Sequence, residues 1–95
     1  MEIEKSLLLG VAADADIEPE NLRWDYSGRG MYGRECFGIV GRMSDYTRFI
    51  VALTQWEDGS ELAGDYAWEL ADRVSTDNMA YDTIFYFPGV KVLDK

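Results

Sequence analysis

The segment that decides the fold is residues 35–56, ECFGIVGRMSDYTRFIVALTQW, because its hydrophobic period changes from strand-like to helix-like within a few positions. At its start, Phe37 and Ile39 alternate with small residues, which is typical of a strand. Further on, apolar residues recur every three or four positions, as on one face of an amphipathic helix: Tyr46, Phe49, Ile50, Leu53 and Trp56. The segment therefore predicts a strand that leads directly into a helix.

The residues before this segment predict a helix and a second strand. Apolar residues at helix-like spacing indicate a short helix within residues 2–15: Ile3, Leu7, Leu8 and Val11. Gly10 is a weak point in this helix because glycine has a low helix propensity. Alternating apolar and polar residues then predict a strand over residues 22–26. We expect this strand to pair with residues 35–41 as an antiparallel hairpin.

The residues after the segment predict a second helix and a closing strand. Ser44 is expected to cap the helix that contains Tyr46 and Trp56, and this helix ends near residue 58. The second helix ends at the polar cluster of residues 75–78, and its apolar stripe consists of Leu62, Tyr66, Leu70 and Val74. Residues 81–87 are rich in aromatic and β-branched side chains and predict a strand. We therefore expect one α+β domain over residues 1–95. In it, a small antiparallel sheet, made of the hairpin and the C-terminal strand, packs against two or three helices.

The composition fits a folded domain and excludes several kinds of chemistry. Of the 95 residues, 47% are apolar and 14% are aromatic, which is enough to build a thin core. Histidine is absent, which removes Ser-His and Cys-His nucleophile pairs and histidine-ligated metal sites. Cys36 stands beside the apolar Phe37, and we interpret it as a small buried hydrophobe. We therefore expect no enzymatic activity, no metal and no cofactor.

The same features indicate the reducing cytoplasm. A secreted domain of this size usually carries several paired cysteines, whereas this chain has one. The longest apolar run, residues 7–13, is too short to span a bilayer. Glu2 and Glu4 precede that run, and their charge has the wrong sign for the start of a signal peptide. We expect a cytoplasmic protein that does not contact a membrane.

Charge is unevenly distributed along the chain, whose net charge is −9. Residues 1–20 and residues 57–82 are strongly acidic, and residues 21–48 between them carry five arginines. Direct binding of nucleic acid is not expected, because affinity for phosphates depends on Lys and Arg. An acidic protein can instead bind a partner with a basic surface.

Five acidic residues of the second helix region recur every three or four positions: Asp58, Glu61, Asp65, Glu69 and Asp72. Side chains at this spacing are neighbours about 5–6 Å apart on one helix face. That separation is close to the spacing of phosphates along a nucleic-acid strand, so the stripe could occupy the basic groove of a DNA- or RNA-binding protein. The alternative is a solvated outer face with no binding role. The sequence leaves both interpretations open.

A glycine-rich connection lies between the two strands of the predicted hairpin. Its glycines allow positive φ and close approach to another group, and its arginines suit a carboxylate or phosphate: Gly28, Arg29, Gly30, Gly33 and Arg34. The connection is not a P-loop, because the Gly-Lys-Ser/Thr ending is missing. Its spacing is the G-x-G-x-x-G of a dinucleotide fingerprint, but no βαβ unit follows it. The connection is therefore either a tight loop whose arginine pairs with an internal acid such as Asp25, or a small-anion or nucleotide site, or a partner contact.

Two blocks of the sequence resemble a family of small uncharacterised bacteriophage proteins. The first block is WDYSGRGMYG at residues 24–33 with CFGI at residues 36–39, and the second is DNM at residues 77–79 with IFYFP at residues 84–88. Together they cover about a third of the chain. No activity accompanies the resemblance, so no functional residue is transferred. It implies a phage gene product that acts on a host protein in the bacterial cytoplasm.

These observations lead to one main hypothesis and two alternatives. The main hypothesis is a phage-type acidic protein that binds a host protein with a basic surface and modulates or inhibits it, as an anti-defence nucleic-acid mimic would. The first alternative is a small-anion or nucleotide-binding protein that uses residues 28–33. The second is a homodimer formed through exposed aromatic side chains such as Trp56 or Trp68.

Overall fold

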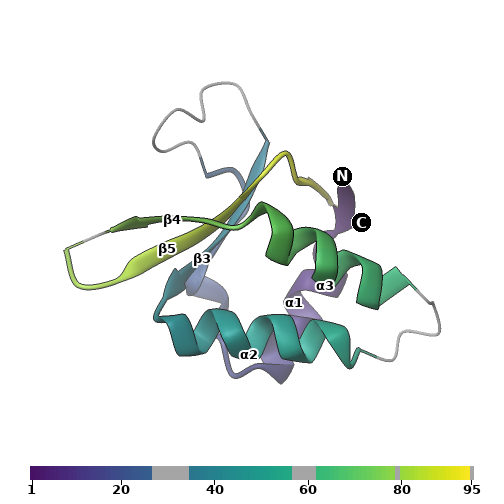
Figure 1. Ribbon diagram of the computed structural model, residues 1–95, viewed down its shortest axis with the longest axis horizontal. Helices are drawn as coiled ribbons and strands as arrows, with labels where there is room; N and C mark the ends of the chain where they lie inside the picture. Colours follow the sequence, from purple (N-terminus) through teal and green to yellow (C-terminus); the bar gives the residue numbers. More distant parts are fainter. Residues whose placement is uncertain (27–34, 57–61, 79, 95) are drawn as a thin grey trace.

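The centre of the fold is a four-stranded antiparallel sheet in the order β2-β3-β5-β4 (Figure 1). The computed structural model describes residues 1–26, 35–56, 62–78 and 80–94. In this part of the chain, three α-helices accompany that sheet and a second, two-stranded parallel sheet. The α+β class predicted from the sequence is confirmed. None of the helices in these ranges is both long enough and apolar enough to cross a membrane.

The two central strands of the sheet are β3 (Cys36–Gly41) and β5 (Thr83–Pro88), which pair along their whole length. The short strand β2 (Leu22–Arg23) pairs antiparallel with β3, and β4 (Ser75–Asn78) pairs antiparallel with β5. The predicted strands at residues 35–41 and 81–87 therefore correspond to the middle of the sheet.

The predicted hairpin forms, but its first strand is shorter than the alternation of residues 22–26 suggested. Only two of these residues belong to β2, with Leu22 opposite Ile39. Tyr26 instead donates its backbone N–H to the carbonyl of Cys36 over 3.0 Å. Its ring packs beside that of Tyr86, with centroids 5.1 Å apart. Beyond β2, Tyr26 therefore packs against the sheet although it does not belong to a strand.

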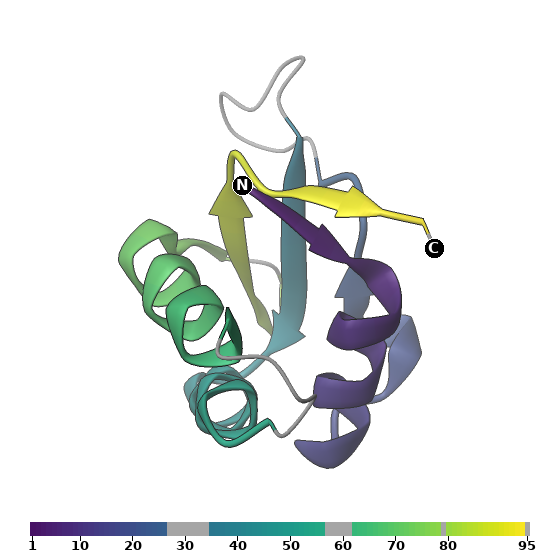
Figure 2. The same ribbon diagram turned by 90° about the vertical axis from the view of Figure 1, so that its right-hand side faces the viewer.

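The two ends of the chain pair with each other. Strand β1 (Glu2–Glu4) runs parallel to β6 (Lys91–Leu93), and helix α1 (Lys5–Asp14) follows β1 directly. Figure 2 shows these strands side by side, with the N-terminus beside β6. The helix predicted from residue 2 therefore begins three residues later. Its first turn is replaced by a strand because residues 2–4 find hydrogen-bonding partners at the other end of the chain.

Helices α2 (Met43–Thr54) and α3 (Leu62–Arg73) correspond to the two amphipathic segments of the sequence. The N-cap of α2 is Arg42, so the prediction of Ser44 as the cap is wrong. The reason is that Asp45 accepts the backbone N–H of Arg42 over 2.7 Å, which satisfies this group two residues before Ser44. The polar cluster after α3, predicted only as a helix end, forms strand β4 against β5.

The core lies between the helices and one face of the sheet, and Phe37 is at its centre. This side chain is fully buried, and its ring centroid lies 5.6 Å from Trp24, 5.9 Å from Phe49 and 5.7 Å from Phe87. In Figure 2, α2 (teal) and α3 (green) lie beside each other, and α1 (purple) lies across from them. A belt of large aromatic rings thus joins β3, β5 and α2, as expected for a small core that must bury much area with few residues.

Gly10 is predicted to resist a substitution that helix propensity alone would favour. A Cβ atom at this position would lie 2.8 Å from Cη2 of Trp56, so Trp56 would have to move. In an unhindered helix, Gly→Ala stabilises by about 1 kcal/mol. We expect Gly10→Ala to show no such gain, and to be neutral or destabilising in urea denaturation. A clear increase in the free energy of unfolding would mean that Trp56 does not pack tightly on Gly10.

Asp45 is predicted to stabilise the start of α2 in a pH-dependent way. The N–H of Arg42, together with the guanidinium of Arg48, holds the pKa of Asp45 below its ordinary value of 3.8. The stabilisation is therefore complete above about pH 4 and is lost as the pH falls through the lowered pKa. We expect Asp45→Asn to cost about 1 kcal/mol at pH 7. In calorimetry, the difference from the wild type should shrink towards pH 3; a constant difference would contradict the assignment.

Candidate functional site

The acidic side chains of α3 lie on its outer face. Asp65, Glu69 and Asp72 are all exposed, and their spacing of four and three residues places them on one side of the helix. On the opposite side, Leu70 is fully buried and Ala67 nearly so. Of the five residues predicted to form the acidic stripe, Asp58 and Glu61 lie outside the described residues. The outer face of α3, meaning Asp65, Trp68, Glu69 and Asp72, is the candidate site.

Trp68 stands among these carboxylates and is 80% exposed. It is three residues after Asp65 and four residues before Asp72, so all three share the outer face. A shallow hollow beside the indole is lined by Trp68, Ala71 and Asp72. Large aromatic side chains normally bury most of their area in a small protein, so exposure of this one is informative. Sequence reasoning named Trp68 only as a dimer contact and did not join it to the acidic stripe.

The other tryptophan considered as an exposed aromatic is placed differently. Trp56 is half-buried, and its ring packs over Gly10 of α1. It contributes to the contact between the end of α2 and α1 and is not a candidate surface residue. The difference between Trp56 and Trp68 depends on which helix face meets the core.

One member of the acidic face is partly neutralised within its own helix. Arg73 forms an ion pair with Glu69 at 3.2 Å, and the same guanidinium donates to the carbonyl of Pro88 over 3.2 Å. Arg73 therefore also fastens the end of α3 to the end of β5. In the described ranges, Asp65 and Asp72 form no ion pair, so their charges remain available to a partner.

Two arginines of the central segment form hydrogen bonds within the fold. Arg23 donates to the carbonyl of Glu20 over 2.6 Å, and Arg48 donates to the carbonyl of Ala15 over 3.0 Å. Arg48 also pairs with Asp45, its neighbour on α2. These guanidinium groups satisfy backbone carbonyls at the ends of helical segments. They therefore do not neutralise the outer face of α3.

The glycine-rich connection predicted as an anion site lies outside the described residues, and this applies to Gly28, Arg29, Gly30, Gly33 and Arg34. The anion-site hypothesis therefore stays a prediction. Next to this connection, the hydroxyl of Tyr26 hydrogen-bonds to the carboxylate of Asp77 on β4 over 3.0 Å. Burial, followed by this hydrogen bond, raises the pKa of Tyr26. The Tyr26 side chain thus links the segment after β2 to the far edge of the sheet.

Cys36 is buried, as its apolar neighbourhood predicted. It belongs to a small cluster on the face of the sheet opposite Phe37, with Val40, Ile84 and Tyr86. Burial raises the pKa of its thiol to about 11, although a backbone hydrogen bond with Phe87 acts in the opposite direction. A thiol with this pKa carries almost no thiolate at neutral pH, so it is a poor nucleophile.

Neither a metal cluster nor a known relative assigns a function to this surface. In the part of the chain that the structure describes, no three Cys, Asp or Glu side chains gather closely enough to hold a metal ion. Comparison of the chain with family models, with curated proteins and with solved structures finds no match. The candidate site therefore rests on its own chemistry, which combines exposed carboxylates with an exposed indole.

The thiol of Cys36 is predicted to be inert in the folded protein. With a pKa of about 11 in place of 9.0, its thiolate fraction at pH 8 is roughly 100-fold lower than in the unfolded chain. Burial slows the reaction further. We expect the folded protein in buffer at pH 8 to react with a thiol reagent at least 100-fold more slowly than the protein unfolded in guanidinium chloride. A concentration of about 6 M unfolds all but hyperstable domains. Similar rates in both solvents would show that Cys36 is accessible.

Proposed function

We propose that this protein is a small acidic binding protein of the phage type, which attaches to a host protein and modulates or inhibits it. The partner presents a basic surface, and the outer face of α3 is the binding surface. The observation that carries the proposal is the 80% exposure of Trp68 between the carboxylates of Asp65 and Asp72.

The indole supplies affinity in this proposal. Tryptophan is enriched among the few residues that carry most of the energy of protein–protein interfaces. It presents a large apolar area with only two rotatable side-chain bonds, so little entropy is lost when it is buried. Arginine and lysine side chains of a partner can also stack on its face. A purely solvated acidic helix has no need of an exposed tryptophan, which favours a binding role over the alternative interpretation of the stripe.

The carboxylates supply selectivity and attraction over distance. Asp65 and Asp72 lie on the same face as Trp68, and neither forms an ion pair within the described residues. A net charge of −9 further favours encounter with a basic partner. Such an interaction weakens with salt, because exposed charges are screened over about 10 Å at 0.1 M ionic strength.

The acidic face and the phage resemblance together point to anti-defence proteins that imitate nucleic acid. Host targets of that type bind DNA or RNA through basic grooves, so a row of carboxylates competes for the same surface. Trp68 adds an apolar contact that a phosphate backbone does not provide. The proposal therefore describes a mimic whose charges give attraction and whose tryptophan gives a specific contact.

Capture from bacterial lysate followed by measurement with the purified partner tests this function. We expect the tagged protein to retain a nucleic-acid-binding protein at low salt and to release it at high salt. Trp68→Ala should then weaken affinity by about 30-fold, the effect of losing about 2 kcal/mol at an interface hot spot. Asp65→Lys combined with Asp72→Lys should weaken it at least as much, because both charges are reversed.

Matched controls separate this surface from general charge and hydrophobicity. Tyr81→Ala removes an aromatic side chain that is 97% exposed elsewhere, and the reversal of Asp82 and Asp94 to Lys changes the net charge equally. Both controls should keep affinity within about 3-fold. Equal weakening by control and test variants would refute the α3 surface. Capture of no partner at either salt would favour a ligand at residues 28–33, to be sought by thermal shift with nucleotides and by loss of that shift in Arg29→Ala.

A further inference from the structure

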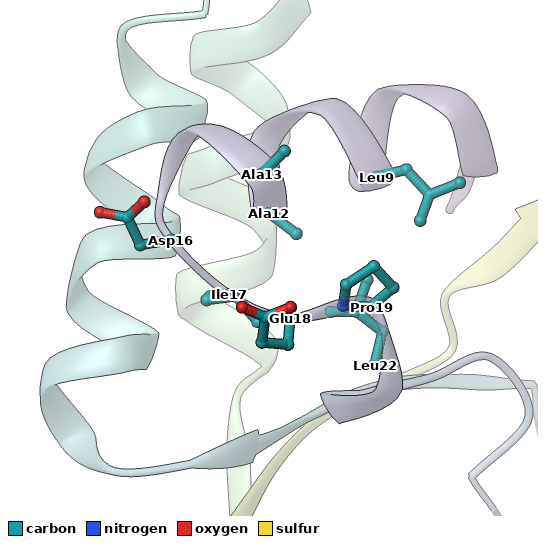
Figure 3. A pocket seen from close by; sticks show the side chains of 8 residues that line it. All are labelled: Leu9, Ala12, Ala13, Asp16, Ile17, Glu18, Pro19 and Leu22. Atoms are coloured by element: carbon teal, nitrogen blue, oxygen red, sulfur yellow. The ribbon is translucent and has the colours of Figure 1, made fainter.

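A groove lies between the second half of α1 and the short 3₁₀ helix η1 (Pro19–Asn21), on different elements from the acidic face of α3 (Figure 3). Its volume is about 190 Å³. The lining is mostly apolar, with the carboxylates of Asp16 and Glu18 at its edge, and consists of Leu9, Ala12, Ala13, Asp16, Ile17, Glu18, Pro19 and Leu22. In Figure 3 the side chain of Leu9 points towards the ring of Pro19 across the groove. Leu9 is 36% exposed, whereas Ile17 and Leu22 are buried beneath it.

The backbone that shapes this groove is held in place by hydrogen bonds. The N–H of Ile17 donates to the carbonyl of Ala12 over 2.8 Å, and the N–H of Asp16 donates to that of Ala13 over 3.1 Å. This is a Schellman end of α1, with Asp16 in the left-handed conformation at φ 58°. Pro19 then fixes its own φ at the first position of η1. A preformed groove of this kind loses little conformational entropy when it is filled.

The size of the groove selects the kind of ligand. Sites for drug-sized ligands and cofactors usually occupy about 300–1,000 Å³, so this groove is too small for a nucleotide. A cavity of about 150 Å³ accepts a molecule as large as benzene. The volume of about 190 Å³ therefore fits one apolar side chain.

The charge at the edge of the groove selects what lies next to that side chain. Asp16 and Glu18 are both exposed, and among the residues that the structure describes no basic side chain lines the groove. Arg48 of α2 donates to the carbonyl of Ala15 and lines a neighbouring hollow together with Asp16, but it does not line the groove. A cation beside the apolar group is therefore favoured, whereas a second copy of this acidic chain and an anionic lipid surface are both disfavoured.

We propose that this groove is a docking site for a peptide segment of a partner protein, in which one apolar side chain is flanked by arginine or lysine. The apolar side chain enters between Leu9 and Pro19, and the cation meets Asp16 and Glu18. The proposal does not rest on the function assigned to α3, because it involves none of the same residues.

Titration of the ¹⁵N-labelled full chain with short probe peptides tests this site by NMR. The probe is acetyl-Arg-Leu-Arg-amide, and its controls replace the leucine by glycine or both arginines by glutamate. We expect the probe to cause saturable shifts in the backbone amides of Ala13, Ile17 and Leu22, with an affinity at least 10-fold above either control. Shifts spread over the whole surface, or equal responses to all three peptides, would overturn the proposal.

Two variants identify the groups responsible. Asp16→Asn with Glu18→Gln removes both charges, and asparagine tolerates the left-handed conformation that Asp16 adopts. The matched control, Asp82→Asn with Asp94→Asn, changes the net charge equally on other exposed residues. We expect the first pair to weaken probe binding at least 5-fold and the second to change it less than 2-fold. Leu9→Ala, which shortens the apolar wall, should also weaken binding at least 5-fold. Equal effects of both charge pairs, or no effect of Leu9→Ala, would reject the groove as the binding site.

Discussion

The burial of Phe37 is the contact on which the rest of the structure depends. Its ring lies within 6 Å of the rings of Trp24, Phe49 and Phe87, so one side chain joins the segment after β2, helix α2 and strand β5. A chain of this length buries only about two-thirds of its unfolded surface, and a few large rings must therefore supply much of the core. Phe37 packs against α2, and α3 packs beside α2. These contacts determine which face of each helix points to solvent.

The chain has 18 acidic and nine basic residues, and three of its arginines form hydrogen bonds within the fold. Arg23, Arg48 and Arg73 all donate to backbone carbonyls, which places these cations at the ends of structural elements. Such bonds satisfy groups that helices leave without partners. Arg48 and Arg73 also pair with Asp45 and Glu69, whereas Asp65 and Asp72 form no ion pair in the described ranges. For the binding roles proposed above, the result is two acidic regions, one on α3 and one between α1 and η1, each next to an exposed apolar side chain.

The acidic face of α3 was largely predictable, but its centre was not. The spacing of Asp65, Glu69 and Asp72 defines one helix face from the sequence alone, because the helical period fixes it. Trp56 continues the apolar stripe of its amphipathic segment, whereas Trp68 lies off the apolar stripe of the next one, but the sequence does not show how far each side chain is covered. Tertiary packing distinguishes them, covering Trp56 with α1 and leaving Trp68 open to solvent. The groove beside α1 was not predictable at all, since it depends on how η1 folds back against that helix.

The sequence by itself determined the α+β class, the central strands β3 and β5, the helices α2 and α3, and the burial of Cys36. The two helices have a clear hydrophobic period, and the two strands are rich in apolar, aromatic or β-branched residues within one continuous segment, so local information is sufficient. Only the tertiary structure decided which short segments at the edges of the fold become strands. Residues 2–4 are strand because they meet β6 at the other end of the chain, and the polar residues 75–78 are strand because β5 offers an open edge. Short segments have too few side chains to carry a period of their own. Their conformation is therefore set by the partners that the folded core brings beside them.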